Sequence, residues 1–218
     1  MNNKSTVERS EEMNESAASQ KTQKPTPQPS SKAQLARLWG MQALLAILTL
    51  SLFAAADSWQ AVTGLALASG LSVVTGIIAG ITLATLIHEW FHLLGAYASK
   101  GDYDIAKHSG LFLFNWNFSN NSVSQFFMMS IAGSVGGALA VVLLWHGIPS
   151  NSWGRVALQS AAIASFINAS LIEWPVLYRT RLSREPLAEL SKVDKGVVLR
   201  CFIAALSAGL LIIIYLAP

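Results

Sequence analysis

Long apolar runs alternate with short polar segments along the chain, and this pattern predicts a helical membrane protein. Each run is long enough to cross the hydrocarbon core of a bilayer, which takes about 20 helical residues. We therefore predict an all-α polytopic membrane protein with about five transmembrane helices and a short interfacial β-strand. The five predicted spans cover residues 35–56, about 74–99, 123–145, 154–178 and 196–216.

The segment between the first two spans is apolar but rich in Gly, Ser and Thr. Residues 61–99 are too long for one crossing at about 1.5 Å per residue, and they hold no polar break that would make two. We predict a polar break at residues 57–60, followed by a short or re-entrant segment over residues 61–73. Within the second span, Gly76 and Gly80 form a G-x-x-x-G pattern, which lets another helix backbone approach closely.

Composition supports a membrane protein and gives the predicted spans a direction. Of the 218 residues, 52% are hydrophobic and 12% are charged, whereas about a quarter of the residues in a soluble domain are charged. The positive-inside rule places the N-terminus in the cytoplasm and the C-terminus outside. A sixth crossing through residues 61–80 would scatter the basic residues over both faces. The basic residues predicted to share the inner side are Lys32, Arg37, Lys100, Lys107, Arg179, Arg181, Arg184, Lys192 and Lys195, and Arg155 lies near the other side.

Two segments outside the spans have patterns of their own. Residues 1–33 are polar and low in complexity, so we expect a disordered cytoplasmic tail. Residues 111–118 alternate with a period of two, which places Phe112, Phe114 and Trp116 on one side. This predicts a strand with an aromatic face, suited to the membrane interface.

The second span carries the candidate chemistry, an H-E-x-x-H motif formed by His88, Glu89 and His92. One helical turn separates the two histidines, so both imidazoles leave the same face and can hold one metal ion. Glu89 is placed to act as the general base on a metal-bound water. Ionisable groups inside a membrane cost roughly 2.5–3.5 kcal/mol each on insertion scales, so they normally mark a functional site. We predict a Zn²⁺ site.

A catalytic zinc site needs a third protein ligand and an open position. Within the predicted spans, the only carboxylates are Glu89 and Glu173. Helical rise places His92 and Glu173 at the same depth, roughly 8–9 Å from the inner ends of their spans. We therefore predict Glu173 as the third ligand. Asn168, near the depth of His88, is predicted to be a ligand or to orient the water or the scissile carbonyl.

Alternatives for these two residues stay open. An interfacial Glu173 would pair with Arg179 or Arg181, and Asn168 would form a hydrogen bond between helices. Loop residues that follow the motif helix would then be ligand candidates, although such residues are usually solvated. These residues are Asp102, Asp104 and His108.

The motif and its surroundings resemble the site-2 protease family of intramembrane zinc metalloproteases over about residues 74–180. Residues 88–92 match the zinc motif of that family. Residues 131–137 are similar to its Ala-Gly-Pro-x-x-Asn stretch, with Ser134 for the Pro and Gly137 for the Asn. From the residues alone, the G-x-x-x-G within this stretch is interpreted as ordinary tight packing.

A second region of similarity runs over residues 165–175, which are similar to the Asn-x-x-Pro-x-x-x-Asp-Gly region of the family. No Asp-Gly follows, and Leu177 or a neighbour stands where the Asp ligand would be. Two interpretations follow from this departure. Either Glu173 supplies the ligand from an adjacent turn, or the chain is a divergent member with a weakened or lost metal site.

The resemblance implies a zinc-dependent metalloendopeptidase that hydrolyses peptide bonds within or next to transmembrane segments of its substrates. The expected partners are a membrane-spanning protein substrate and the lipid bilayer, with no nucleic acid, and the expected location is a bacterial cell (inner) membrane. Residues 34–218 would form the metalloprotease-like domain. The alternatives are a catalytically degenerate protein of the same fold, which binds metal or membrane helices, and a gluzincin. Gluzincins carry larger soluble parts than this chain has room for.

Overall fold

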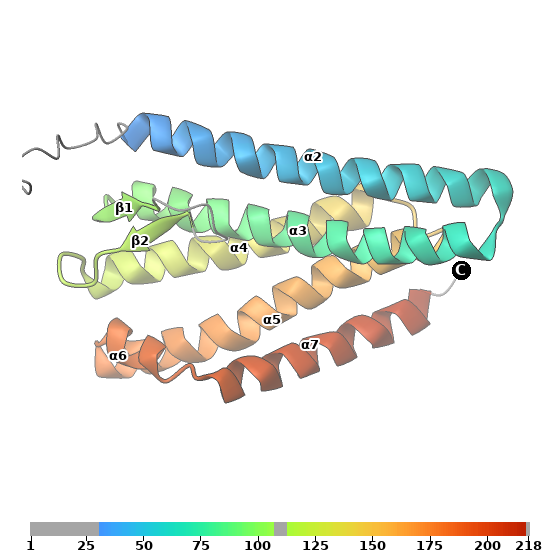
Figure 1. Ribbon diagram of the computed structural model, residues 1–218. Coiled ribbons are helices and arrows are strands. Elements are labelled where there is room, and N and C mark those ends of the chain that lie inside the picture. Colours follow the sequence, from blue (N-terminus) through green and yellow to red (C-terminus); the bar gives the residue numbers. More distant parts are fainter. Residues whose placement is uncertain (1–30, 107–112, 217–218) are drawn as a thin grey trace, which may run out of the picture. The chain divides into compact units, whose positions relative to one another are not determined.

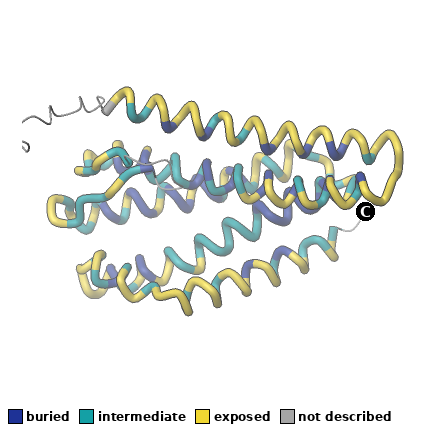
Figure 2. Tube along the Cα trace, viewed as in Figure 1, coloured by how far each residue is buried: buried dark blue, intermediate teal, exposed yellow. Residues whose placement is uncertain are grey.

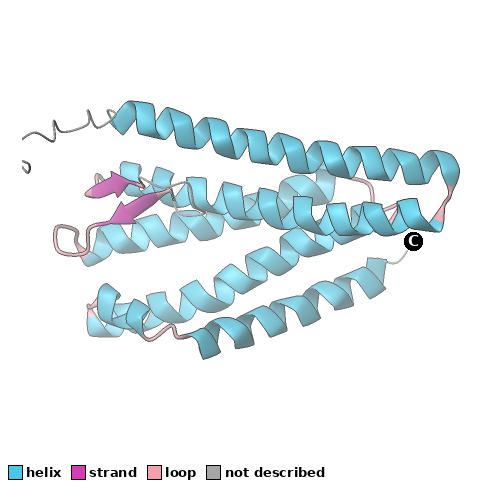
Figure 3. Ribbon diagram, in the orientation of Figure 1, coloured by secondary structure: helices cyan, strands magenta, loops and turns pink. Residues whose placement is uncertain are grey.

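A computed structural model describes residues 31–106 and 113–216 of the chain. The chain divides into two compact units, Met1–Ala33 and Gln34–Pro218. The tail expected to be disordered lies outside the described residues except for its last three, which begin the first helix. The elements in chain order are α2 (Ser31–Thr63), α3 (Ala66–Ala98), β1 (Tyr103–Ile105), β2 (Phe114–Trp116), α4 (Val123–Gly147), α5 (Trp153–Ser183), α6 (Pro186–Ser191) and α7 (Lys195–Leu216) (Figures 1 and 3).

Five of the described helices, α2, α3, α4, α5 and α7, are long and apolar enough to cross a membrane. Within the unit of residues 34–218, α3 and α5 are central: α3 packs against α4 and α5, and α5 also contacts α7 and the short α6 (Figure 1). The prediction of a largely helical chain with five such helices and a small β element is confirmed to this extent.

The predicted re-entrant segment over residues 61–73 is wrong. Helix α2 runs through the expected break at residues 57–60 and ends at Thr63, and residues 66–98 form the single helix α3. The turn lies at Gly64, whose φ of 65° is left-handed and therefore suits a residue without a Cβ. Gly64 and Leu65, and no polar stretch, separate the first two helices.

The break was predicted at Asp57 because a charged residue is usually exposed in a loop. In the structure, Asp57 is buried inside the bundle. Its side chain is 8% exposed. The carboxylate accepts hydrogen bonds from Ser72 of α3 at 3.2 Å, from Ser152 at 2.8 Å and from the Arg155 guanidinium of α5 at 2.8 Å. These partners compensate the charge, so a helix can carry it into the interior.

Close helix crossing between α3 and α5 explains the first G-x-x-x-G pattern. A Cβ on Gly76 would collide with the backbone of Gly154, and one on Gly80 would collide with the carbonyl oxygen of Leu158. The prediction that these glycines admit another helix backbone is confirmed. Their contacts bring α3 and α5 together along the part of α3 that precedes the H-E-x-x-H motif.

The outer surfaces of α2 and α7 are mostly exposed (Figure 2). Large apolar side chains make up much of these surfaces, and such surface is rare on water-soluble proteins. Examples are Leu44, Ile47 and Leu48 on α2 and Leu206, Leu210 and Leu211 on α7.

The predicted aromatic strand is confirmed in part, as β2. It pairs antiparallel with β1, with Tyr103 opposite Trp116 and Ile105 opposite Phe114. Phe112, which the sequence placed on the same face, lies outside the described residues. The hairpin packs on a buried apolar cluster to which α3, α4 and α5 contribute.

Helix α5 differs from its predicted end. The predicted span ends at residue 178, but the helix contains Pro175 and continues to Ser183. Directly after Pro175, Val176 and Leu177 of the same helix join the buried cluster beneath the hairpin. Packing of these residues stabilises the helix beyond the missing hydrogen-bond donor of the proline.

Candidate metal centre

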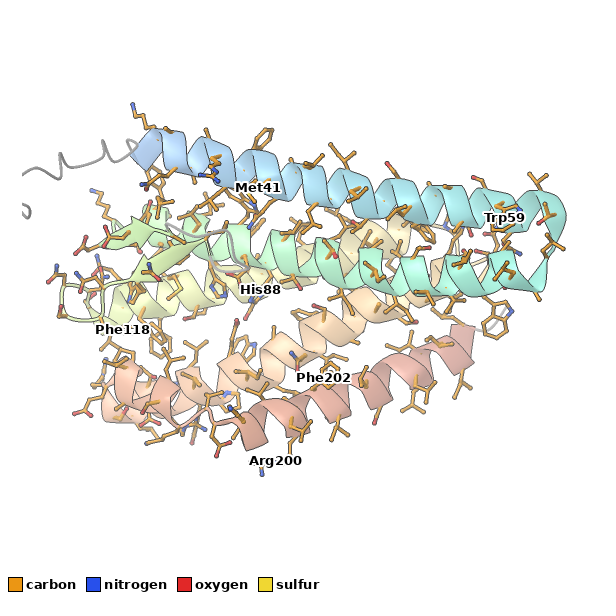
Figure 4. The ribbon with its side chains drawn as sticks, viewed as in Figure 1. Met41, Trp59, His88, Phe118, Arg200 and Phe202 are labelled. Carbon is orange, nitrogen blue, oxygen red and sulfur yellow. The ribbon has the colours of Figure 1, made fainter. Side chains whose placement is uncertain are left out.

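Two helices bring three ligand atoms to one point. His88 and His92 stand one turn apart on α3, and Glu173 approaches from α5. The Oε1 atom of Glu173 lies 2.8 Å from Nε2 of His88 and 3.1 Å from Nε2 of His92. The two Nε2 atoms are 2.9 Å apart. His88, labelled in Figure 4, is buried at 8% exposure, and His92 and Glu173 are partly buried.

The donor set fits a zinc ion. Tetrahedral zinc with bonds of about 2.0–2.1 Å separates its ligand atoms by about 3.3 Å. The three observed separations of 2.8, 2.9 and 3.1 Å lie a few tenths of an ångström below this value. Two imidazoles and one carboxylate leave the fourth position of a tetrahedral ion open, as in catalytic zinc sites.

The orientation of the His92 ring is set by the neighbouring helix. Its Nδ1 lies 3.0 Å from the carbonyl oxygen of Met129 on α4, an acceptor only, so Nδ1 carries the proton and donates it. Nε2 is then left with its lone pair toward His88 and Glu173. A second hydrogen bond of this kind is typical of metal-binding histidines.

Ser134 of α4 orients the third candidate ligand, and the sequence interpretation did not assign it this role. Its hydroxyl donates to Oε2 of Glu173 at 3.2 Å, while Oε1 faces the histidines. Ser134 is itself buried. The only signal in the sequence was a hydroxyl residue within the glycine-rich stretch of α4.

The second G-x-x-x-G pattern makes room for the histidines. A Cβ on Gly133 would collide with the imidazole of His92, and one on Gly137 would lie 3.3 Å from Nδ1 of His88 and closer still to the Phe166 ring. From the sequence alone, ordinary tight packing was the predicted role of these glycines. The structure shows that the packing partners include the imidazoles of the motif.

Glu89 shares a cavity of about 490 Å³ with His92 and Glu173. Phe114 and Trp116 of β2 line the same cavity, so the aromatic face of the strand lies at the candidate centre. The arrangement places two of the three candidate ligands, the carboxylate of Glu89 and a strand around one space. Apolar residues of α4, α5 and α6 complete the lining.

Asn168 lines a different cavity. It lies with Thr85 and Ser165 in a space between α3, α5 and α7, and not with Glu89. Its Oδ1 atom is buried and has no hydrogen-bond partner among the described residues. The predicted contact of Asn168 with the water or scissile carbonyl stays a prediction, and its surroundings offer it another role.

Two of the residues considered as alternatives, one as a partner of Glu173 and one as a ligand in its place, have other hydrogen-bond partners. Arg179 donates to Glu189 of α6 at 3.0 Å. Asp102 accepts hydrogen bonds from Asn117 and Asn120 in the loop region. Asp104 lies in β1, and His108 lies outside the described residues.

No family model, no curated protein and no solved structure matches the chain. The geometry of the centre alone therefore carries the functional conclusion.

Proposed function

We propose that the chain is an intramembrane zinc metalloprotease, which hydrolyses peptide bonds within or next to transmembrane segments of its protein substrates. The observation that supports this proposal most strongly is the convergence of His88, His92 and Glu173, whose ligand atoms lie within 4.8 Å of one another. A carboxylate, Glu89, lies beside this group in an open cavity.

The bundle that holds the centre is suited to a bilayer. Five helices are long and apolar enough to span it, and the exposed sides of α2 and α7 are largely hydrocarbon. Titratable groups in such an environment are costly and usually functional. The N-terminus is proposed to lie in the cytoplasm, on the side where the loops are rich in Lys and Arg.

The residues around the centre would have different roles in peptide hydrolysis. Zinc in this position would supply Lewis-acid chemistry, activating a water molecule and polarising a carbonyl. His88, His92 and Glu173 would hold the ion. Glu89 would take a proton from the attacking water and return it to the leaving amine, as a general base and then a general acid.

The outer edge of β2 is suited to hold an unwound substrate. The N–H of Asn117 donates to Asp102, and the N–H of Ala106 donates to Leu113. In this antiparallel register, the backbone groups of Phe114 point away from β1. The same holds for Trp116. An extended peptide could therefore add to this edge by backbone hydrogen bonds next to the cavity.

A Glu89→Gln variant tests the proposal. The amide keeps the size of the side chain but cannot take up a proton, so cleavage of single-span membrane proteins in proteoliposomes should fall at least 100-fold. Bound zinc should stay at the wild-type level. Glu185→Gln, which changes an exposed glutamate at the start of α6, serves as the control with full activity. Undiminished cleavage by the Glu89 variant would contradict the proposed base.

The absence of an Asp-Gly pair in α5 favours a second candidate function, in which the same centre binds metal or a membrane helix without cutting. A protein of this kind would bind zinc through the same residues. It would leave every member of a panel of membrane-spanning proteins intact, at any zinc concentration.

A further inference from the structure

A groove on the bundle lies next to the metal centre and is not used by the chemistry above. It has a volume of about 350 Å³ and lies between α3, α5 and α7. Phe202, labelled in Figure 4, lines it from α7. Its two sides are apolar residues of α3 and α7, such as Ile81 and Leu206. The floor is a stripe of small residues on α5 at helical spacing: Ala157, Ser160, Ala161, Ala164, Ser165 and Asn168.

Polar atoms without partners lie in this floor. Ser160 is 1% exposed, and its hydroxyl has no hydrogen-bond partner among the described residues. The buried Oδ1 of Asn168 has none either. Between them, Ser165 and Thr85 bond each other at 3.3 Å. Unpaired polar atoms in an apolar site are costly, so an occupant that supplies hydrogen bonds would stabilise them.

The groove leads to the centre. From residue 157 to residue 168 it follows α5 for about 16 Å, which is roughly half the thickness of a hydrocarbon core. At its near end, Thr85 precedes His88 by about 4.5 Å of helical rise, and Asn168 precedes Glu173 by about 7.5 Å. A ligand that fills the groove would therefore end next to the candidate metal ligands.

We infer that this groove is the docking site for the transmembrane helix of the substrate, and that it selects helices with a small-residue face and a hydroxyl or amide side chain. This inference rests on the proposed function, because it names the site at which the substrate of that reaction binds. Small residues on both helices allow close backbone approach, and Ser160 would bond a polar side chain across the interface. Asn168 would bond backbone groups where the docked helix unwinds toward the centre.

A helix fits the groove better than a lipid chain does. A lipid tail would satisfy the apolar side walls but would leave Ser160 and Asn168 without hydrogen bonds. The small residues of the floor recur every three to four positions, which matches the ridge of a packed helix. The volume of about 350 Å³ admits one face of a helix, with its remaining surface toward lipid.

Peptide binding to the full-length chain tests the inference. The chain carries Glu89→Gln so that no peptide is cut, and is labelled at its N-terminus in phospholipid vesicles. The probes are two synthetic 23-residue transmembrane peptides. One has an Ala/Gly face with a single Ser, and the other is all leucine. Energy transfer should report at least 10-fold tighter association of the small-faced peptide.

Groove-filling substitutions at exposed positions locate the binding site. Ile81→Trp and Leu206→Trp narrow the groove from its two sides, and both positions are exposed, so the fold should tolerate them. Each should weaken association of the small-faced peptide about 10-fold. The matched controls are Ile78→Trp on α3 and Leu199→Trp on α7, which are also exposed but do not line the groove. The controls should bind like the parent.

Ser160→Ala tests the hydrogen bond. Association of the Ser-bearing peptide should fall about 3- to 10-fold, the range expected for a hydrogen bond between membrane helices. A peptide with Ala in place of that Ser should bind the parent and the Ser160 variant equally. If the Ser160 variant weakens both peptides alike, the proposed hydrogen bond is wrong.

The outcomes separate this inference from the proposed function. Peptide binding in the groove by a chain whose wild type cuts no membrane protein would support the docking site and refute the protease. Cleavage by the wild type that is unaffected by Ile81→Trp and Leu206→Trp, with unchanged peptide binding, would refute the docking site alone. Equal binding of the all-leucine peptide would also refute it and indicate a lipid chain as the occupant.

Discussion

Glu173 Oε1 lies 2.8 Å from Nε2 of His88, although 85 residues separate them in the chain. The contact joins α3 to α5 and brings a carboxylate to the first histidine of the motif. A carboxylate and two imidazoles at such separations could hold a metal ion. The arrangement also depends on α4, which supplies a carbonyl to His92, a hydroxyl to Glu173 and space for both imidazoles.

Ser134→Ala should weaken zinc binding without removing a ligand. Loss of the hydroxyl leaves Oε2 of Glu173 without its donor, so the carboxylate is less well oriented. Changes to such supporting groups cost about 10- to 100-fold in metal affinity. We expect about a 10-fold increase in the zinc dissociation constant, measured by competition with a chelator, and partial rescue by Ser134→Thr.

The control for this change lies one turn earlier on the same helix. Ser130 is equally buried but bonds none of the three candidate ligands among the described contacts. Ser130→Ala should therefore leave zinc affinity within about 2-fold of wild type. Equal affinities of the Ser134 and Ser130 variants would show that the hydroxyl of Ser134 does not support the centre.

Gly133→Ala should displace His92 and lower both zinc affinity and stability. A Cβ at this position collides with the imidazole ring. Overpacking of this kind costs about 1–3 kcal/mol in the free energy of unfolding. The unfolding temperature in detergent should decrease, and the amount of bound zinc should fall by at least 10-fold.

Gly147→Ala is the matched control, because it is on the same helix and a Cβ there meets no atom within 4 Å. It should retain wild-type unfolding temperature and zinc content. A Gly133 variant that behaves like the Gly147 variant would contradict the close approach of α4 to His92.

Glu189 should make α6 sensitive to acid. Its carboxylate accepts from Lys192 at 2.8 Å and from Arg179 at 3.0 Å. Hydrogen bonding to the Lys192 ammonium, aided by Arg179 and opposed by burial, lowers the pKa of Glu189 below its ordinary value of 4.5. This contribution to stability is present above pH 4.5 and is lost as the pH falls through the lower folded-state pKa.

Glu189→Gln removes this titration. At pH 7 the variant should have a lower unfolding temperature than wild type, because it lacks the ion pairs. Between pH 7 and pH 3 its unfolding temperature should fall less steeply than that of wild type. Glu185→Gln, at an exposed glutamate, should keep the wild-type profile. Identical profiles for wild type and the Glu189 variant would exclude the ion pairs as the anchor of α6. Leu190 of α6 lines the cavity of Glu89, so loss of the ion pairs of Glu189 should also open this cavity to solvent.

The sequence could predict that Glu173 lies near His88 and His92 because helical rise is a fixed quantity. Counting residues from the helix ends placed His92 and Glu173 at one depth, and their side chains meet at 3.1 Å. The same counting could not supply rotation about the helix axis. Asn168, at a similar depth, turns toward α7 and lines the groove, away from the cavity of Glu89.

The turn between α2 and α3 was predicted at the wrong place because a charged residue was taken to mark the end of a helix. Asp57 suggested a loop, but its three partners lie on other elements and are distant in the chain, so no local pattern reveals them. The turn between the helices lies at Gly64, which has a positive φ. Similarly, the roles of Gly133 and Ser134 depend on which face of α4 meets α3, which is a tertiary property.

Bound zinc in the purified full-length protein tests the central claim most directly. Mass-spectrometric metal analysis of wild type, His88→Ala and Glu173→Ala, with Glu185→Gln as control, compares ligand loss with a neutral change. We expect about one zinc per chain in wild type and control, and loss of most of it in both ligand variants. Full occupancy in Glu173→Ala, or a wild type that takes up no zinc, would contradict it.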